Sequence, residues 1–379
     1  MSHSLSRSKV VISGTGLFTP DETITNAELV ESFNRYVDAF NRDNMQAIDA
    51  GELEPLEYSS EAFIVKASGI ESRHVVNKSG VLDPSRLCPS IPERGDEEPS
   101  LQCEMAVSAA REALAQANKS PAEVDAVIVA CSNLQRAYPA IAIEVQDALG
   151  IQGFAFDMNV ACSSATFGLQ AARDAILAGS AETVLLVNPE ICSGHLAWQD
   201  RDCHFIFGDV CTALVVESAE NSDGDENWEI VGTRLLTRFS NNIRNNFGFL
   251  NRCDESGVGA RDKLFRQNGR KVFKEVVPMV AEMIESHLTD ESIGLSSLKR
   301  MWLHQANLGM NQLIAKKVLG RDATVNEAPV ILNEYANTSS AGSVIAFHKH
   351  RNDMAVDDVG VICSFGAGYS AGSVIVRRS

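Results

Sequence analysis

The sequence lacks every feature that would place the chain in a membrane. Its longest apolar runs, such as Ala126–Cys131 and Val184–Val187, are the length of a strand, whereas a membrane-spanning helix needs about 18 apolar residues or more. The segment Met1–Lys9 is mostly polar and has no apolar core of the kind found in signal peptides. We therefore expect a cytoplasmic protein that does not bind membranes.

Paired cysteine spacing is also missing. The nine cysteines, an odd number, are scattered along 379 residues without a C-x-x-C pair. This distribution excludes a disulfide scaffold and a zinc site of the usual spacing. We predict no metal site, and we expect most of these cysteines to be small buried apolar residues.

Positive charge is scarce. The chain has 33 Lys and Arg against 50 Asp and Glu, which gives a net charge of −17. An acidic surface repels nucleic acid phosphates and anionic membranes, and the sequence contains no recognition helix or basic tail. Nucleic acid binding is therefore excluded, and any acidic partner must find a local basic patch.

What the sequence does contain is a regular alternation of strands and helices. The strand Phe154–Val160, for example, leads into the alanine-rich helix Ser163–Ala178. Such alternation predicts an α/β fold with helices around mostly parallel sheets. The other expected helices are Asn26–Phe40, Glu104–Asn118, Val272–Leu288, Asn307–Leu319 and Ser339–His350, and the other expected strands are Ala126–Cys131, Thr183–Asn188, Ala213–Glu217, Leu298–His304, Val359–Ser364 and Ser373–Arg377.

Polar stretches interrupt this pattern. Asn41–Glu61 is acidic and Asn77–Ser100 is rich in Pro, Ser and charge, so we expect both to be surface excursions. Gly14 and Gly16 follow the opening strand but lack the third glycine of a dinucleotide fingerprint, and we expect a plain strand end there.

The two halves of the chain echo each other. Ala161–Ala165 and Asn337–Gly342 are both small and polar, and each opens a predicted helix. Similarity at half the chain length predicts a duplicated fold. We place one half in residues 1–220 and the other in residues 221–379, with the boundary in the acidic segment Ala219–Glu229.

Three side chains are expected to meet where the two halves meet. In a duplicated α/β fold, corresponding loops lie together at the strand ends, which brings Cys162 near Asn337, with His304 from a neighbouring strand. Cys162 comes between a strand and a helix, and a helix N-terminus favours the thiolate form of a cysteine. The alternative is a buried structural cysteine at a tight turn.

His304 and Asn337 each have a structural interpretation as well as a functional one. His304 follows an apolar strand and suits acid–base work or the polarisation of a carbonyl group, but it also suits a core histidine. Asn337 suits an oxyanion donor or a helix cap. The glycine-rich turn Phe365–Gly372 is either a hairpin connection or the source of a backbone N–H beside the nucleophile.

Taken together, these segments resemble the β-ketoacyl-ACP synthase III family nearly from end to end. The resemblance implies a homodimeric thiolase fold, with duplicated αβαβα layers, mixed sheets and two pseudo-symmetric halves. It implies that acyl-CoA and malonyl-acyl carrier protein are substrates and that no cofactor is needed. The segments that carry it are Ser68–His74, Tyr138–Pro139, Cys162, Arg201, Phe207–Asp209, Gly269–Lys274, His304–Asn307, Asn337–Ser339 and Phe365–Gly372.

The resemblance also implies a role for each site residue. Cys162 carries the acyl group as a thioester, while His304 and Asn337 hold the malonyl thioester oxygen as carbon dioxide leaves and β-ketoacyl-ACP forms in fatty acid biosynthesis. The backbone N–H groups of Cys162 and Ala367 form the oxyanion hole. The substrate-binding residues implied are Phe63, Arg201 and Gly269 in the CoA channel, Asn307 near His304, and Tyr138, which enters the partner subunit's acyl pocket.

A basic cluster on two predicted helices could supply the patch that an acidic carrier protein needs. Its alternative is an ordinary solvated face. The cluster consists of Arg270, Lys271, Lys274, Lys316 and Lys317. Beside it, Gly309 stands where the family often has a basic residue, and Phe63 stands for the family's tryptophan.

The primer is expected to be a medium-chain acyl group of about eight carbons instead of acetyl, because each buried CH₂ contributes about 0.8 kcal/mol. This expectation assumes a pocket wall of small or flexible side chains. Alternatives are a specialised ketosynthase for a secondary metabolite or long-chain ketone, a catalytically idle partner subunit and a cysteine hydrolase. The assumed wall residues are Met158, Ala161, Ser163, Ser164 and Ala165.

Overall fold

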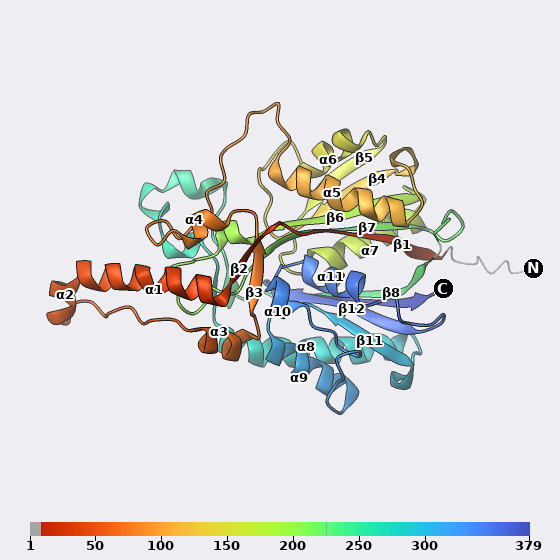
Figure 1. The fold of residues 1–379 in the computed structure, drawn as a ribbon. Helices are drawn as coiled ribbons and strands as arrows, with labels where there is room; N and C mark the ends of the chain where they lie inside the picture. The colour runs from red at the N-terminus through yellow and green to blue at the C-terminus, as the bar shows by residue number, and fades with distance from the viewer. Residues whose placement is uncertain (1–8, 225) are drawn as a thin grey trace, which may run out of the picture.

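A computed structural model describes residues 9–224 and 226–379. Residues 1–8, most of the segment in which we expected no signal peptide, lie outside the described residues. The fold is built on a nine-stranded sheet in the order β11-β12-β13-β8-β1-β7-β6-β4-β5 (Figure 1). Its strands are β1 (Val10–Phe18), β4 (Ala126–Ala130), β5 (Phe154–Met158), β6 (Thr183–Ile191), β7 (Asp209–Ser218), β8 (Trp228–Thr237), β11 (Leu298–Leu303), β12 (Val359–Gly366) and β13 (Ser370–Arg378).

The sheet consists of two similar parts. In the first, β4 is parallel to β6, which is antiparallel to β7, and β7 is antiparallel to β1. In the second, β11, β12, β13 and β8 repeat this order and these directions. Only two residue pairs, Val11 with Glu229 and Ile12 with Trp228, join β1 to β8. The predicted duplication is therefore visible in the strand order, and a boundary at about residue 220 stays a prediction.

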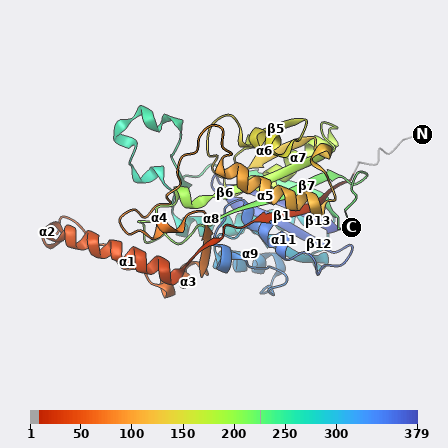
Figure 2. The same cartoon turned by 45° about the horizontal axis from the view of Figure 1, so that its top comes forward.

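Helices complete five layers: they lie above, between and below the two sheet parts in Figure 1, and Figure 2 shows the same stack turned by 45°. Helices α7 (Ser164–Leu177) and α11 (Ala341–Lys349) form the middle layer and pack on strands of both parts. α5 (Leu101–Gln116) and α6 (Ile141–Leu149) cover the outer face of the first part. α8 (Gly269–Asp290) and α9 (Leu308–Leu319) cover that of the second. The αβαβα arrangement with a mixed sheet is thus confirmed.

Close approach between layers accounts for the first two glycines. A Cβ atom on Gly14 would lie 2.1 Å from the carbonyl oxygen of Ala113, and one on Gly16 would lie 2.0 Å from that of Ala109. Both glycines therefore let β1 lie directly against α5. We expected the strand to end there, but β1 continues through both glycines to Phe18. In the middle layer, Trp228, Trp302 and Phe347 pack edge to face, with ring centroids 4.9–5.6 Å apart.

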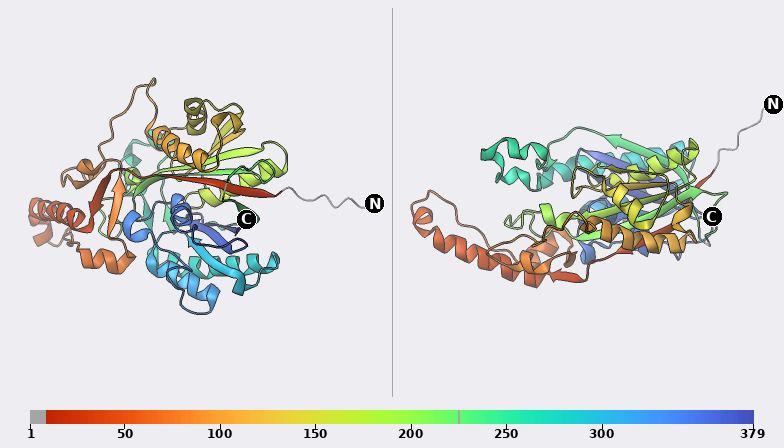
Figure 3. Two further views of the ribbon diagram at one scale, coloured as in Figure 1. Left: turned by 45° about the vertical axis from the view of Figure 1, so that its right-hand side comes forward. Right: turned by 90° about the horizontal axis from the view of Figure 1, so that it is seen from above.

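Two segments project beyond the layers at one end of the molecule (Figure 3). One contains α1 (Asn26–Asp43), α2 (Met45–Asp49) and α3 (Glu61–Ser68). The other spans residues 239–268 and contains short 3-10 turns and strands β9 (Ile243–Arg244) and β10 (Arg266–Gln267). β2 (Glu22–Thr25) pairs with β3 (Ser72–Val75), α4 spans Lys78–Leu82, and α10 spans Leu332–Tyr335.

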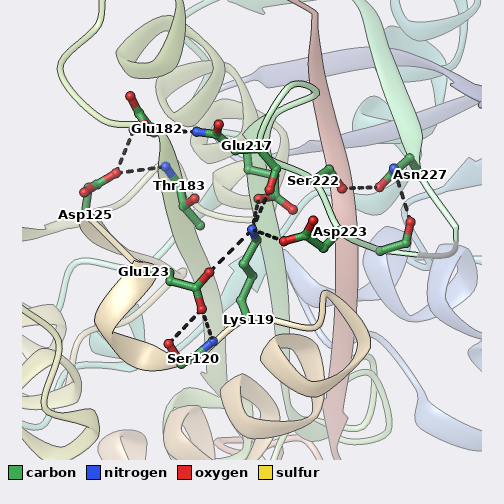
Figure 4. Close-up of polar contacts among 12 residues, drawn as sticks. Lys119, Ser120, Glu123, Asp125, Glu182, Thr183, Glu217, Ser222, Asp223 and Asn227 are labelled. Atoms are coloured by element: carbon green, nitrogen blue, oxygen red, sulfur yellow. Dashed lines mark hydrogen bonds and ion pairs between the residues drawn. The ribbon is translucent and has the colours of Figure 1, made fainter.

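The connection between the two parts is fixed by a buried lysine (Figure 4). The ammonium group of Lys119, whose side chain is 5% exposed, lies 3.4 Å from the carboxylates of both Glu217 and Asp223. It also donates to the carbonyl oxygen of Asn221. A buried charge needs such partners, so Lys119 ties the acidic connection to the end of β7.

Two expectations were wrong in detail. The sheet is mixed and not mostly parallel, because β6–β7, β12–β13 and both neighbours of β8 run antiparallel. The acidic segment expected to be a boundary ends inside β8, a strand that we did not predict. In Trp228–Ile230, the half-buried Glu229 stands between two buried apolar residues, and the acidic residues that precede this strand hide its start.

Candidate active site

Cys162, His304 and Asn337 line one cavity of about 750 Å³. Cys162 comes from the loop before α7, His304 follows β11, and Asn337 follows α10. The first belongs to the first sheet part and the other two belong to the second. The structure therefore brings the three predicted side chains together at the junction of the two halves.

The backbone around Cys162 is held in an uncommon conformation. Ala161 has a φ of +48°, which non-glycine residues seldom adopt, and its N–H donates to Oδ1 of Asn159 at 2.8 Å. We expected the N-terminus of α7 to favour the thiolate. Instead, burial outweighs that effect and raises the pKa of the Cys162 thiol to about 11, although the Ser339 hydroxyl and the backbone amide of Ala367 oppose the rise.

His304 lies in an apolar setting. It is buried, its ring packs edge to face on Phe365 with centroids 5.2 Å apart, and its backbone N–H donates to Cys363 at 2.7 Å. Burial lowers the pKa of His304 to about 4. The imidazole is therefore neutral near pH 7, with one nitrogen able to donate and one able to accept.

Asn337 is fixed by backbone pairing across the two halves. Its N–H donates to Ile206 at 2.9 Å, and its carbonyl accepts from Gly208 at 3.2 Å. Its side-chain oxygen accepts from the N–H of Ser339 at 2.9 Å. Because the oxygen is engaged, the amide N–H₂ is the group left for the cavity that Asn337 lines. Ser339 also donates its hydroxyl to Sγ of Cys162 at 3.4 Å.

The turn after β12 closes the site on its other side. A Cβ atom on Gly366 would lie 2.5 Å from Cβ and 2.9 Å from Sγ of Cys162. Only glycine therefore lets this turn approach the thiol. Ser370 anchors the turn by donating to Val160 at 3.3 Å and to the hydroxyl of Ser163 at 3.0 Å. This anchoring keeps the Ala367 amide beside the cysteine.

The predicted channel residues lie around the cavity. Phe63 and Gly269 line it. The Arg201 guanidinium stacks over Phe63, 4.1 Å from the ring centroid, and its Nε donates to Tyr58 at 2.7 Å. Asn307 also lines the cavity, but its amide donates to Ala67 at 2.7 Å and its oxygen caps α9, so its polar groups are already engaged.

The wall of the cavity differs from our expectation. Of the five small or flexible residues that we assigned to it, Ser163, Ser164 and Ala165 are buried in the start of α7, and none of the five lines the cavity. Residues 41–61 and 77–100 contribute none of its lining either. The wall is instead mainly aromatic and aliphatic: Phe205, Ile206, Phe207, Ile243, Phe265, Val272, Phe273, Val276, Met310 and Phe365.

The basic cluster is divided by the structure. Arg270 lines the cavity, and Lys271 and Lys274 are exposed on the first turns of α8. Lys316 and Lys317 lie in the last turn of α9, about 14 Å along the helix from Asn307. There Lys316 pairs with Asp322 at 2.9 Å. Of the five residues, only Arg270 lines the cavity, and Lys271 and Lys274 are its neighbours on α8.

Sequence reasoning missed the contributions of Ser339, Gly366 and the aromatic wall. Ser339 stood in a quoted motif, yet nothing in its spacing showed that its hydroxyl would reach the thiol. Gly366 stood in a glycine-rich turn in which each glycine was equivalent by sequence. The wall is assembled from segments that lie far apart in the sequence, and only their packing brings them together.

The fold and the three residues facing the cavity define a thiolase-fold condensing enzyme. A family model described as 3-oxoacyl-[acyl-carrier-protein] synthase III matches residues 156–237, and the model of its C-terminal part matches residues 288–378. A β-ketodecanoyl-[acyl-carrier-protein] synthase of Pseudomonas aeruginosa is 65% identical over 349 residues, which cover 92% of this chain and 100% of that protein. The chain belongs to the β-ketoacyl-[acyl-carrier-protein] synthase III family, the condensing acyltransferases of fatty acid synthesis.

More distant relatives agree. A β-ketoacyl-[acyl-carrier-protein] synthase III of Granulibacter bethesdensis is 28% identical, and the match covers 97% of this chain and 98% of that protein. The crystal structure of 3-oxoacyl-[acyl-carrier-protein] synthase III from Aquifex aeolicus superposes with a TM-score of 0.74 at 26% identity, covering 97% and 99% of the two chains. The predicted family, fold and type of reaction are thus confirmed.

Gly366→Ala should slow acylation of Cys162 by about 100-fold, because a methyl group 2.9 Å from Sγ must displace the thiol. Acylation is measured as the mass added to the intact protein. Gly259→Ala is the control, since nothing lies within 4 Å of a Cβ at that position. If both variants acylate at the wild-type rate, the turn does not set the position of the thiol.

Proposed function

We propose that this protein condenses a medium-chain acyl-CoA of about eight carbons with malonyl-ACP, through acyl-Cys162, to give β-ketoacyl-ACP, CoA and carbon dioxide. The observation that carries the proposal is the shared cavity lined by Cys162, His304 and Asn337. The Pseudomonas relative is named for a β-ketodecanoyl product. Two of the ten carbons in such a product come from malonyl-ACP, which leaves a primer of about eight.

Acylation begins from a neutral pair. At neutral pH the thiol is protonated and the imidazole is unprotonated, given pKa values of about 11 and about 4. As Sγ of Cys162 attacks the thioester carbon, His304 accepts the thiol proton, and the backbone N–H groups of Cys162 and Ala367 bind the oxyanion. The proton then passes to the departing CoA sulfur.

Condensation uses the same side chains as donors. His304 and the Asn337 amide donate to the thioester oxygen of malonyl-ACP, so that the bond to the carboxylate breaks and carbon dioxide leaves. The resulting carbanion attacks the acyl carbon on Cys162, and the cysteine sulfur leaves. The aromatic wall limits water near the acyl-enzyme and so favours transfer over hydrolysis.

A homodimer is supported by the uncovered edge of the sheet. Among the described residues, β5 pairs on one side only, with β4, and its Phe154 and Phe156 are 42% and 39% exposed. Ile143 of the adjacent α6 is also exposed, and the Tyr138 side chain stands 84% exposed in the loop before that helix. An edge strand with exposed aromatic residues is a template for pairing, and a second copy on β5 would cover them and receive Tyr138.

The remaining parts of the proposal follow from the chemistry. CoA and carrier-protein thioesters are substrates, and the steps above need no cofactor. No helix among the described residues is long and apolar enough to cross a bilayer. We place the reaction in the cytoplasm, where both thioesters are used, with no part for membranes or nucleic acid.

Acylation of Cys162 should be fastest with octanoyl-CoA among acetyl-, butyryl-, octanoyl- and dodecanoyl-CoA. Apolar burial favours the longer chain until the pocket is full. Intact-protein mass spectrometry gives the rates, and Cys162→Ala should take up no acyl group. Rates that fall steadily from acetyl-CoA would contradict the medium-chain assignment, and an adduct on Cys162→Ala would contradict the nucleophile.

His304→Ala and Asn337→Ala should lose about 100- to 1,000-fold in decarboxylation of malonyl-ACP, because each removes one donor to the thioester oxygen. Both should still form acyl-Cys162, with His304→Ala slower since it also lacks the proton acceptor. Release of carbon dioxide and intact mass report the two half-reactions. Normal decarboxylation by either variant would remove that residue from the proposed role.

Lys274→Glu should weaken the use of malonyl-ACP about tenfold and reduce its salt dependence, while acylation by acyl-CoA stays near the wild-type rate. Lys299→Glu is the matched control, because that exposed lysine lies at the start of β11, about 17 Å along the strand from His304. If Lys274→Glu and Lys299→Glu weaken the use of malonyl-ACP equally, the carrier protein does not dock at α8. The same conclusion follows if Lys274→Glu slows acylation by acyl-CoA as much as it weakens the use of malonyl-ACP.

A further inference from the structure

Glu190, at the end of β6, is a buried carboxylate that the reaction steps above do not use. The residue is 1% exposed and lines no part of the cavity. It accepts hydrogen bonds from the backbone N–H of Ser132 at 3.0 Å and of Ser340 at 3.1 Å, and from the hydroxyls of both serines. A carboxylate with four donors is held in one orientation, and it holds its donors in turn.

The two serines come from different halves of the fold. Ser132 lies two residues beyond the end of β4 of the first sheet part, next to Cys131, and Ser340 is the last residue before α11 of the second. The Glu190 side chain therefore accepts hydrogen bonds from one loop of each half.

The hydrogen bonds between Ser340 and Glu190 position the loop that contains Asn337. Ser340 lies three residues beyond Asn337. Its neighbour Ser339 donates its backbone N–H to Oδ1 of Asn337 at 2.9 Å. Fixing the N–H and hydroxyl of Ser340 fixes the turn that orients the Asn337 amide. It also fixes the Ser339 hydroxyl that lies 3.4 Å from Sγ of Cys162.

The hydrogen bonds between Ser132 and Glu190 position the loop that contains Cys162. The amide of Asn159 donates to the carbonyl oxygen of Ser132 at 2.8 Å, and Oδ1 of the same asparagine accepts from Ala161 at 2.8 Å. Ala161 is the residue with φ of +48° that precedes the nucleophile. A shift of Ser132 would therefore be passed through Asn159 to the backbone of Cys162.

We propose that Glu190 is a positioning residue that sets the separation between the Cys162 loop and the Asn337 loop. The proposal rests on the function assigned above, because it takes Asn337 as a donor in decarboxylation. Glu190 touches no substrate, and its effect is passed on through Ser132 and Ser340.

Charge alone does not explain why a carboxylate occupies this place. Glu190 is one of the groups that raise the pKa of Cys162, so its negative charge works against formation of the thiolate. Its geometry is what serves the reaction. Oε1 accepts from Ser132 N and from both groups of Ser340, and Oε2 accepts from the Ser132 hydroxyl.

Glutamine can reproduce this geometry. In Glu190→Gln the side-chain oxygen can stay among three donors, and the amide nitrogen can donate to a Ser132 hydroxyl turned to accept. Glu190→Gln should therefore keep decarboxylation within about threefold of wild type, whereas Glu190→Ala should lose about 100-fold, the cost of misplacing a reacting group by about 1 Å. Octanoyl transfer to Cys162 should fall less than about tenfold in Glu190→Ala, since the loop of Cys162 is also held independently of Glu190, for example by the Val160 N–H, which donates to the Ser164 hydroxyl at 2.9 Å.

The matched control is Glu217→Gln. Glu217 is equally buried but lies at the end of β7, which runs antiparallel to β6, and it pairs with Lys119 (Figure 4). This variant should lower the thermal midpoint while leaving both half-reactions unchanged. If Glu190→Ala does not fold, Ser340→Ala provides the same comparison by removing one hydroxyl donor, and it too should lose decarboxylation more than acylation.

The positioning role is overturned if Glu190→Gln is as slow in decarboxylation as Glu190→Ala, since charge would then matter more than geometry. It is also overturned if Glu190→Ala, or Ser340→Ala in its place, loses both half-reactions equally or neither. Failure of the proposed function itself would look different, because wild-type protein would then form no acyl-Cys162 or release no carbon dioxide.

Discussion

The backbone pairing of Asn337 with the segment Ile206–Gly208 is the constraint on which the rest of the site depends. The two hydrogen bonds of 2.9 and 3.2 Å join a loop of the second half to the strand entry of the first. Because the middle helices α7 and α11 are shared by both sheet parts, this junction cannot open without disturbing the core. Cys162, His304 and Asn337 are thereby held by packing as well as by hydrogen bonds.

Burial at this junction decides the protonation states. It raises the pKa of the Cys162 thiol and lowers that of the His304 imidazole, so the resting pair is neutral. A neutral pair suits both half-reactions. The imidazole can accept the thiol proton in the first, and its N–H can donate to the malonyl thioester in the second without leaving a stable ion pair. The same burial strengthens each hydrogen bond of the site, and it raises the free-energy cost of leaving a polar group without a partner.

Much of the fold was predictable, because strong periodicity and strand–helix alternation are local signals. The strand Ala126–Ala130 and the helix α8 lie close to where their apolar patterns placed them. β8 was missed because the run of acids before it resembles a linker. The turn Phe365–Gly372 was left open between a hairpin connection and a source of a backbone N–H, and it joins β12 and β13 as an antiparallel pair.

The site was predictable to a different degree. Cys162, His304 and Asn337 each end an element and open another, and the repeat between the halves placed them together. The hydroxyl of Ser339 and the carboxylate of Glu190 could not be found in this way, since their partners are 177 and 150 residues away in sequence. The cavity wall could not be found in this way either, because phenylalanines form much of it where we expected small or flexible residues.

In the proposed reaction, an eight-carbon acyl group passes through Cys162 to a two-carbon unit on a carrier protein. The most direct test is to incubate the wild-type protein with octanoyl-CoA and malonyl-ACP and to determine the mass of the carrier protein afterwards. We expect β-ketodecanoyl-ACP to accumulate and CoA and carbon dioxide to be released in equal amounts with it. A carrier that still bears malonyl or only acetyl, with octanoate free in solution, would contradict the proposed reaction.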